Sequence, residues 1–391
     1  MSDQMRIPCV IMRAGTSKGI FLKGNDLPAD QELRDKVILR IFGSPDVRQI
    51  DGLAGADPLT SKLAIIGPST HPDADVDYTF AQVSITDAVV DYNGNCGNIS
   101  AGVGPFAIDE SFVKAVEPMT RVCIHNTNTG KLLYAEVEVE DGKAKVSGDC
   151  KIDGVPGTNA PELMDFSDTA GAATGKVLPT GNVVDVLSTS KGDIDVSIVD
   201  VANPCIFVHA KDVNMTGTET PDVINGNADL LAYLEEIRAK CCVKIGMAAT
   251  EKEASEKSPA FPMIAFVTKP EDYVDFSTGN TISGDDVDLV SRLMFMQVLH
   301  KTYAGTATAC TGSAARIPGT IVNQVLRDTG DEDTVRIGHP AGVIPVVSIV
   351  KDGKVEKAAL IRTARRIMEG YVYVEKAKLV GSAWSHPQFE K

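Results

Sequence analysis

The chain has 391 residues, a length that suits two domains of ordinary size, and its formal net charge at pH 7 is −15. So acidic a protein is a poor partner for nucleic acid or for an anionic membrane surface, and an anionic substrate must be drawn in by local cations. The eight cysteines show no Cys-x-x-Cys spacing, the six histidines are scattered and no apolar run approaches the roughly 18 residues of a membrane span, so we expect a cytoplasmic protein without disulfides or a metal site.

The first predicted elements are two strands, at residues 5–12 and 20–22, joined by the turn Arg13–Gly19, which is rich in glycine, hydroxyl groups and cations. This turn lacks the Gly-x-x-x-x-Gly-Lys spacing of a phosphate loop and no helix follows it, so it gives nucleotide binding little support. We interpret it as a carboxylate-binding turn, with Thr16, Ser17 and backbone N–H groups as donors. A purely structural turn is the alternative.

A lysine opens the third predicted strand. Residues 30–42 have the spacing of an amphipathic helix, and Lys62 then begins a strand over 62–66. Asp57 is the nearest acidic residue in the sequence around Lys62. Lys62 is therefore either a cation free to act on a ligand or a solvated surface lysine.

Residues 91–98 form the stretch around which we expect the chain to be organised. They follow an alternating strand at 80–85 and precede a segment of small residues that predicts a short buried helix, encircled by other elements. Cys96 would sit at the strand-to-helix turn, where unpaired backbone N–H groups and the positive end of the helix dipole favour a thiolate and bind carboxylates. Gly97 and Asn98 suit this turn and leave room for a ligand. A buried, inert cysteine is the alternative.

The second half of the chain is expected to repeat this plan. Strands are also predicted within 76–90 and at 120–125, 131–139, 143–147, 183–187, 195–199, 205–209, 263–267, 335–337, 343–350 and 355–360, with 365–374 closing the fold. The remaining predicted helices are 228–241 and 287–300, and residues 307–316 are expected to run into a further helix that ends at 326. Cys310 and the residues after it read as the counterpart of the Cys96 turn, which makes Gly312 and Ser313 candidates for substrate binding at a second helix N-terminus. Two helix N-termini that face each other across a cleft could bind two carboxylates. His300 could hold one of these carboxylates, or it could simply end a helix.

We place the domain change near residues 178–182. The sequence thus predicts a first domain at 1–180 and a second at 181–366, with 367–380 expected to return to the first. Residues 381–391 read as a linker followed by an affinity tag, Trp384–Lys391, which carries no functional meaning.

Four motifs, in the same order along nearly the whole chain, carry a resemblance to a known family. Asn93-Gly-Asn-Cys-Gly-Asn98 resembles the turn before the central helix of the diaminopimelate epimerase fold. Residues 12–19 (Met-Arg-Ala-Gly-Thr-Ser-Lys-Gly), 57–62 (Asp-Pro-Leu-Thr-Ser-Lys) and 315–320 (Ala-Arg-Ile-Pro-Gly-Thr) resemble motifs of the PrpF branch of that superfamily. The resemblance implies an α/β (α+β) fold with two pseudo-symmetric domains, each a β-sheet wrapped around a central helix, and an active site in the interdomain cleft.

The PrpF branch includes methylaconitate isomerases, oxalomesaconate tautomerases and methylitaconate Δ-isomerases, and the chain most resembles the last group. This resemblance implies a cofactor-independent isomerase and carries the branch's active-site lysine onto Lys62. The implied reaction is a 1,3-proton transfer that shifts a C=C bond in a small unsaturated dicarboxylate, foremost (R)-3-methylitaconate to 2,3-dimethylmaleate. Cys96 as a thiolate would move the proton, while Lys62 would stabilise the thiolate and pair with a substrate carboxylate. The family also leads us to expect a homo-oligomer.

Three other interpretations stay open. The substrate could be 2-methylaconitate or 4-oxalomesaconate, and a tricarboxylate would need a further cationic pocket, for which Arg13, Lys18 and Arg316 are candidates. An amino-acid epimerase would use Cys96 and Cys310 on opposite faces of one carbon. A non-catalytic dicarboxylate-binding protein would keep the fold without the chemistry.

Overall fold

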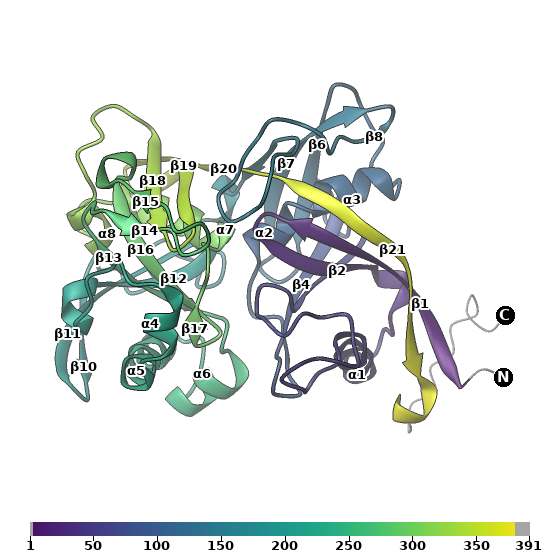
Figure 1. The fold of residues 1–391 in the computed structure, drawn as a ribbon, viewed down its shortest axis with the longest axis horizontal. Coiled ribbons are helices and arrows are strands. Elements are labelled where there is room, and N and C mark those ends of the chain that lie inside the picture. Colours follow the sequence, from purple (N-terminus) through teal and green to yellow (C-terminus); the bar gives the residue numbers. More distant parts are fainter. Residues whose placement is uncertain (1–2, 380–391) are drawn as a thin grey trace.

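The computed structural model describes residues 3–379, so the predicted affinity tag and the linker before it lie outside the described part. The chain folds into two lobes that lie side by side (Figure 1). The N-terminal strands and the first three helices build one lobe, and the remaining helices belong to the other (Figure 1). A long strand near the C-terminus runs from the second lobe back along the first.

The first lobe contains, in chain order, β1 (Gln4–Ala14), β2 (Ser17–Lys23), α1 (Gln31–Phe42), β3 (Lys62–Pro68), β4 (Val76–Val83), β5 (Val90–Asp91), α2 (Gly97–Ser100), α3 (Val103–Asp109), β6 (Met119–Asn126), β7 (Lys131–Glu140), β8 (Lys143–Ala144) and β9 (Glu162–Asp165). The second contains β10 (Asp185–Thr189), β11 (Gly192–Val201), β12 (Asn203–His209), α4 (Pro221–Asn225), α5 (Ala228–Lys244), α6 (Glu251–Lys257), β13 (Met263–Thr268), β14 (Tyr273–Val274), β15 (Thr281–Ile282), β16 (Leu289–Phe295), β17 (Val298–Leu299), α7 (Gly305–Ala315), α8 (Ile321–Val325), β18 (Thr334–His339), β19 (Gly342–Lys351) and β20 (Lys354–Arg362). The chain then continues as β21 (Ala364–Glu375).

The two lobes repeat one pattern of strand pairing. In the first, β2 pairs parallel with β3, β3 antiparallel with β4, β4 parallel with β6, and β6 antiparallel with β7. In the second, β12, β13, β16, β18 and β19 pair in the same sequence of parallel and antiparallel neighbours. An antiparallel hairpin opens each set, β1–β2 in one lobe and β11–β12 in the other. The mixed α/β architecture with two pseudo-symmetric halves is therefore as expected.

Two strands tie the lobes together. β9 pairs with β7 of the first lobe and with β20 of the second. β21 follows β20 and pairs antiparallel with β1, from Ala364 opposite Ala14 to Glu375 opposite Gln4, which is the yellow strand that crosses between the lobes in Figure 1. The domain boundaries expected at 180 and 366 stay predictions.

A helix of small residues runs through the centre of each lobe. Every residue of α7 is buried, and so is every residue of α3 before Asp109. Small residues let the sheets approach closely: a Cβ on Gly104 would lie 2.8 Å from Val137 Cγ2, and one on Gly312 would lie 2.6 Å from Val346 Cγ1. The sheets therefore close directly onto the two helices, which fixes where each helix begins relative to the junction of the lobes.

Two of the predicted helices are wrong. Residues 287–300 form β16, a tight turn and β17. Every residue of β16 is buried, so its apolar run carries no alternation that would distinguish a strand from a helix. Residues 307–316, expected to lead into a helix that ends at 326, already belong to the helix α7, and α8 follows as a separate helix because Pro318 lies between them and cannot continue α7.

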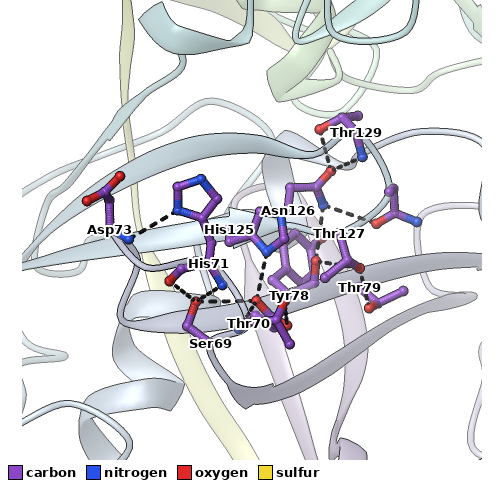
Figure 2. A network of polar contacts seen from close by, with 12 residues as sticks. Ser69, Thr70, His71, Asp73, Tyr78, Thr79, His125, Asn126, Thr127 and Thr129 are labelled. Atoms are coloured by element: carbon purple, nitrogen blue, oxygen red, sulfur yellow. Dashed lines mark hydrogen bonds and ion pairs between the residues drawn. The ribbon is translucent and has the colours of Figure 1, made fainter.

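A polar network holds β4 against β6 in the first lobe (Figure 2). His125 Nδ1 lies 2.8 Å from Asp77 Oδ1, and Asn126 Oδ1 accepts hydrogen bonds from the N–H and the hydroxyl of Thr129 at 3.2 and 2.8 Å. The rings of His71 and His125 lie 5.2 Å apart. Even so, no three potential metal ligands gather anywhere within residues 3–379. These contacts join strands and a turn, and we assign them no catalytic part.

Candidate active site

Lys62 and Cys96 meet in the interior of the molecule. Lys62 Nζ donates to Cys96 Sγ at 3.3 Å, and the two residues are 1% and 4% exposed. Lys62 opens β3, and Cys96 precedes α2 with an extended backbone (φ −113°, ψ 102°). The rings of Phe295 and Phe80 also lie near the ammonium group, with their centroids at 4.6 and 5.8 Å. Among residues 3–379 no carboxylate forms an ion pair with Lys62, so its charge is available to stabilise a thiolate.

The starts of α2 and α7 face each other next to this pair. A Cβ on Gly97 would lie 2.5 Å from Thr306 N, and one on Gly305 would lie 2.8 Å from the carbonyl carbon of Gly97. A side chain at either position would collide with backbone, so glycine is required on both sides of the contact. The N-terminal ends of α2 and α7, one from each lobe, thus meet next to Cys96.

The sequence misplaced the second of these helix starts. The residue before α7 is Ala304, and Cys310 lies in the middle of the helix, fully buried, with its thiol donating to the Val199 carbonyl at 3.2 Å. Gly312 and Ser313 lie further along α7, where Gly312 packs against β19. The expectation that these three residues form a second turn at the site is therefore wrong, because α7 begins five residues before Cys310.

His300 presents an N–H group without a partner. Its Nδ1 accepts the Thr302 N–H at 3.2 Å, while its Nε2 is buried and unbonded. Burial, with the positive charge of Lys62 adding to it, lowers the pKa of His300 to about 3. A neutral imidazole that accepts at Nδ1 carries its proton on Nε2. His300 is therefore a neutral donor close to Lys62 rather than the end of a helix.

The turn between β1 and β2 packs against the residues after Cys96. Asn98 Nδ2 donates to Thr16 Oγ1 at 3.1 Å and to the Tyr303 carbonyl at 3.3 Å, which joins the two lobes. Thr302 Oγ1 donates to Thr16 Oγ1 at 2.8 Å. Ser17 is buried, and its hydroxyl has no hydrogen-bond partner in the described part of the chain. Thr16 is thus bonded to Asn98, two residues beyond Cys96, and the part of these residues in binding stays a prediction.

Sequence reasoning missed further polar residues at this junction. Gln82 lies directly opposite Lys62 in the β3–β4 pairing, and its buried Oε1 has no hydrogen-bond partner. Asn203 of the second lobe accepts the Asn95 N–H at 3.0 Å, donates to the Asn95 carbonyl and donates to Thr306 Oγ1 at 2.9 Å. Gln82 could have been found from the sequence by asking which residue of the neighbouring strand pairs with Lys62. No local signal marks Asn203, because its partners are about a hundred residues away in either direction.

Two cavities flank the cluster. The larger, of about 700 Å³, is lined by both lobes, with Gln82 and Ser84 on one side and Ser255, Met296 and Gln297 on the other. The smaller, of about 190 Å³, includes Thr16, Tyr303, His339 and Arg362 in its wall. An ion pair, Lys301 Nζ to Asp57 Oδ2 at 2.7 Å, bridges the lobes nearby. Cys96 and Lys62 are almost completely buried, and neither residue belongs to the wall of either cavity.

A family model described as "PrpF protein" matches residues 4–375. The chain belongs to the PrpF family. The crystal structure of a methylitaconate-delta-isomerase is 59% identical, with 97% of this chain and 100% of that chain covered and a TM-score of 0.57. A (4E)-oxalomesaconate Delta-isomerase of Novosphingobium sp. is 41% identical over 94% of this chain and 97% of the relative. A 2-methyl-aconitate isomerase of Shewanella oneidensis is 40% identical over 95% and 98%.

More distant structures share the fold of this PrpF family member. A hydroxyproline epimerase from Agrobacterium vitis, 11% identical, superposes with a TM-score of 0.55 over 96% of this chain and 92% of that one. This likeness confirms the diaminopimelate epimerase-like fold. Membership of a family of isomerases makes the chain an isomerase. Within residues 3–379 no helix has the length and hydrophobicity needed to cross a membrane.

Proposed function

We propose that the chain moves a C=C bond by 1,3-proton transfer in a small unsaturated dicarboxylate, and that (R)-3-methylitaconate, converted to 2,3-dimethylmaleate, is its substrate. The observation that carries the proposal is the contact of Lys62 Nζ with Cys96 Sγ at 3.3 Å, where an ammonium group without a carboxylate partner faces a sulfur between two helix starts. The identity of 59% to a methylitaconate-delta-isomerase favours this substrate over the alternatives.

The reaction needs one base. The Cys96 thiolate takes the proton from the carbon that bears a methyl group, a carboxylate and the neighbouring alkene. The electron pair of that C–H bond forms the new C=C bond between the two carboxylate-bearing carbons. The electrons of the old double bond then take the proton from the Cys96 thiol at the methylene carbon, which becomes a methyl group. The thiolate is regenerated, and no cofactor takes part in this sequence.

The remaining residues bind the anion that develops between the two steps. Negative charge spreads over the allylic carbons and the adjacent carboxylate, so donors must be in place before the proton leaves. Lys62 supplies charge, and the unpaired N–H of His300 and the unpaired hydroxyl of Ser17 supply hydrogen bonds. Thr16, Gly97 and Asn98 shape the turn against which the substrate rests.

The test is turnover of (R)-3-methylitaconate in D₂O, followed by ultraviolet absorbance and by NMR. We expect a conjugated diacid whose new methyl group carries less than one deuterium on average. In a fraction of turnovers the single thiol returns the same proton that it removed, before that proton exchanges with D₂O. Absorbance that stays constant over hours at micromolar enzyme would overturn the proposed substrate. A full deuterium from the first turnover would overturn the single-base step.

The relatives support two alternative substrates within the same chemistry. The 2-methyl-aconitate and (4E)-oxalomesaconate isomerases are 40% and 41% identical to the chain. Parallel assays with 2-methylaconitate and 4-oxalomesaconate therefore rank three substrates by kcat/KM. A dicarboxylate-binding protein without chemistry would bind all three and convert none. Homo-oligomerisation and a cytoplasmic location stay predictions.

A further inference from the structure

The end of β20 carries a cation that the chain itself does not neutralise. The side chain of Arg362 is 3% exposed, and its Nη1 donates to the carbonyl of the preceding residue, Ile361, at 3.3 Å. Within residues 3–379, its Nε and Nη2 have no hydrogen-bond partner. Burial lowers the pKa of Arg362 to about 9, which leaves the guanidinium charged at neutral pH. A buried charge with unused donors is costly, so an anion is the missing partner.

The acids near Arg362 do not fill this role. Glu162 lies opposite Arg362 in the β9–β20 pairing, yet the two form no ion pair and both oxygens of Glu162 are unbonded. Burial raises the pKa of Glu162 well above its ordinary value, which favours the uncharged acid. Asp153, in the wall of the cavity, already accepts the Val343 N–H at 2.8 Å and has Lys151 at 3.8 Å.

Arg362 is one of the residues that line the cavity of about 190 Å³, together with Thr16 and His339, which carry two further donors. Thr16 Oγ1 accepts from Asn98 and from Thr302, which leaves its own hydroxyl proton free. His339 is buried, and its Nδ1 accepts the Ala341 N–H at 3.2 Å, so a neutral ring carries its proton on Nε2. The volume exceeds by several-fold the roughly 30 Å³ that a water occupies in the liquid, so a carboxylate arm fits.

Thr16 connects this cavity with the Lys62–Cys96 pair. It bonds to Asn98, which follows Cys96 by two residues, and to Thr302, which also holds His300. A substrate whose reacting carbons lie at Cys96 could therefore extend one arm past Thr16 towards Arg362. The two arginines considered in the sequence analysis already have partners within the chain: Arg13 donates to Asn159 Oδ1 at 2.6 Å and Arg316 to Thr329 Oγ1 at 2.7 Å.

We infer that Arg362, Thr16 and His339 form a second carboxylate subsite, which holds the substrate carboxylate that Lys62 does not hold. The inference rests on the proposed function for the position of the reacting carbons. The site should therefore select molecules with carboxylates on two adjacent carbons over molecules with a single carboxylate. Arg362 would bind the remote carboxylate through two parallel N–H groups, a geometry that lysine cannot reproduce.

Binding to the full chain, measured by calorimetry, tests this without turnover. The probes are maleate and (Z)-2-butenoate, which differ by the exchange of one carboxylate for a methyl group. We expect Arg362→Met to weaken maleate binding by about 10- to 100-fold, Arg362→Lys to weaken it less, and both to leave (Z)-2-butenoate binding within about twofold. Arg316→Met is the matched control, since that guanidinium bonds to the chain's own atoms and its loss should lower Tm but leave maleate binding unchanged.

The outcomes separate the subsite from the proposed reaction. Maleate binding within about twofold of wild type in folded Arg362→Lys and Arg362→Met would overturn the subsite, as would an equal loss for both probes. If Arg362→Met does not fold, Arg362→Lys decides alone: unchanged maleate affinity overturns the inference, and a selective loss supports it. Failure of the wild type to convert methylitaconate would count against the proposed function only, because these affinities are measured on a stable diacid.

Discussion

Ala304 stands before α7 in the place that Cys96 holds before α2. Both residues have extended backbone, at φ −70° and ψ 134° for Ala304, and the helices they precede touch through Gly97 and Gly305. The pseudo-symmetry of the lobes thus provides two equivalent positions on opposite sides of one junction, and only one of the two has a sulfur. An epimerase that needs a thiol on each face of a carbon lacks its second base here.

Removal of each thiol in turn should therefore have unequal effects. We expect Cys96→Ser to lower kcat by about 10²- to 10⁴-fold, the range typical of a lost general base. Cys310→Ser makes the same change of one atom at a buried thiol bonded to Val199, and it should keep kcat within about twofold. Initial rates with methylitaconate measure both. Equal losses in the two variants would contradict a one-base mechanism.

Replacement of the buried lysine should separate activity from stability. Lys62→Met removes the ammonium group that faces Cys96 and should lower kcat/KM by about 100-fold or more. Its Tm should stay level or rise, because an apolar side chain of similar length replaces a charge that lies among Phe295 and Phe80. Lys36→Met, at an exposed position on α1, is the control and should change neither quantity. A fall in Tm that parallels the loss of activity would instead mark Lys62 as structural.

Acid should destabilise the fold through His300. Its folded pKa of about 3 lies below the ordinary value of about 6.5, so the unfolded chain binds the proton first as the pH falls. The stabilisation is fully present above about pH 6.5 and is lost as the pH falls towards 3. Tm measured between pH 7.5 and 4.5 should consequently fall less steeply in His300→Asn than in the wild type. Identical slopes would show that His300 is protonated in the folded protein.

The ion pair between the lobes should control access to Cys96. Asp57 and Lys301 belong to different lobes and lie 2.7 Å apart, with the lysine side chain half exposed. An exposed pair contributes only about 0.2 to 1 kcal/mol, so Asp57→Asn should hardly change Tm. Asp57→Asn should nevertheless speed alkylation of Cys96 by iodoacetamide up to about fivefold, because the free energy needed to separate the lobes falls by up to about 1 kcal/mol. Peptide mass spectrometry measures the rate.

A pair confined to one lobe provides the comparison. Glu32→Gln breaks the Lys36–Glu32 contact on α1 and should leave alkylation of Cys96 unchanged. Saturating maleate should slow alkylation in the wild type and in both variants, since the ligand occupies the same junction. Alkylation that is equally fast in the wild type and in Asp57→Asn would mean that opening does not depend on this contact.

The sequence predicted the Cys96 turn well because its signals are local. An alternating strand, a Gly–Asn turn and a run of small residues lie within about thirty positions, and each property is set by neighbours along the chain. The same reasoning failed at residues 287–300, where burial on both faces removes the alternation that identifies a strand. It also failed at Cys310, since small buried residues throughout α7 hide where that helix begins.

No local pattern in the sequence predicts which residues pair in space, and the meeting of Lys62 with Cys96 was expected only from the family resemblance. Lys62 meets Cys96 because β3 and β4 pair in a register that brings the start of β3 beside the end of the turn. Arg362 and Thr16 line one cavity, and β20, which carries Arg362, pairs with β9. The two residues are 34 positions apart in the first case and over 300 in the second, where no spacing rule applies. The sequence by itself determined which residue types could do the chemistry and which local backbone conformation they adopt. The closure of two sheets onto two helices determined which of them share one buried junction, because burial and register depend on the whole fold.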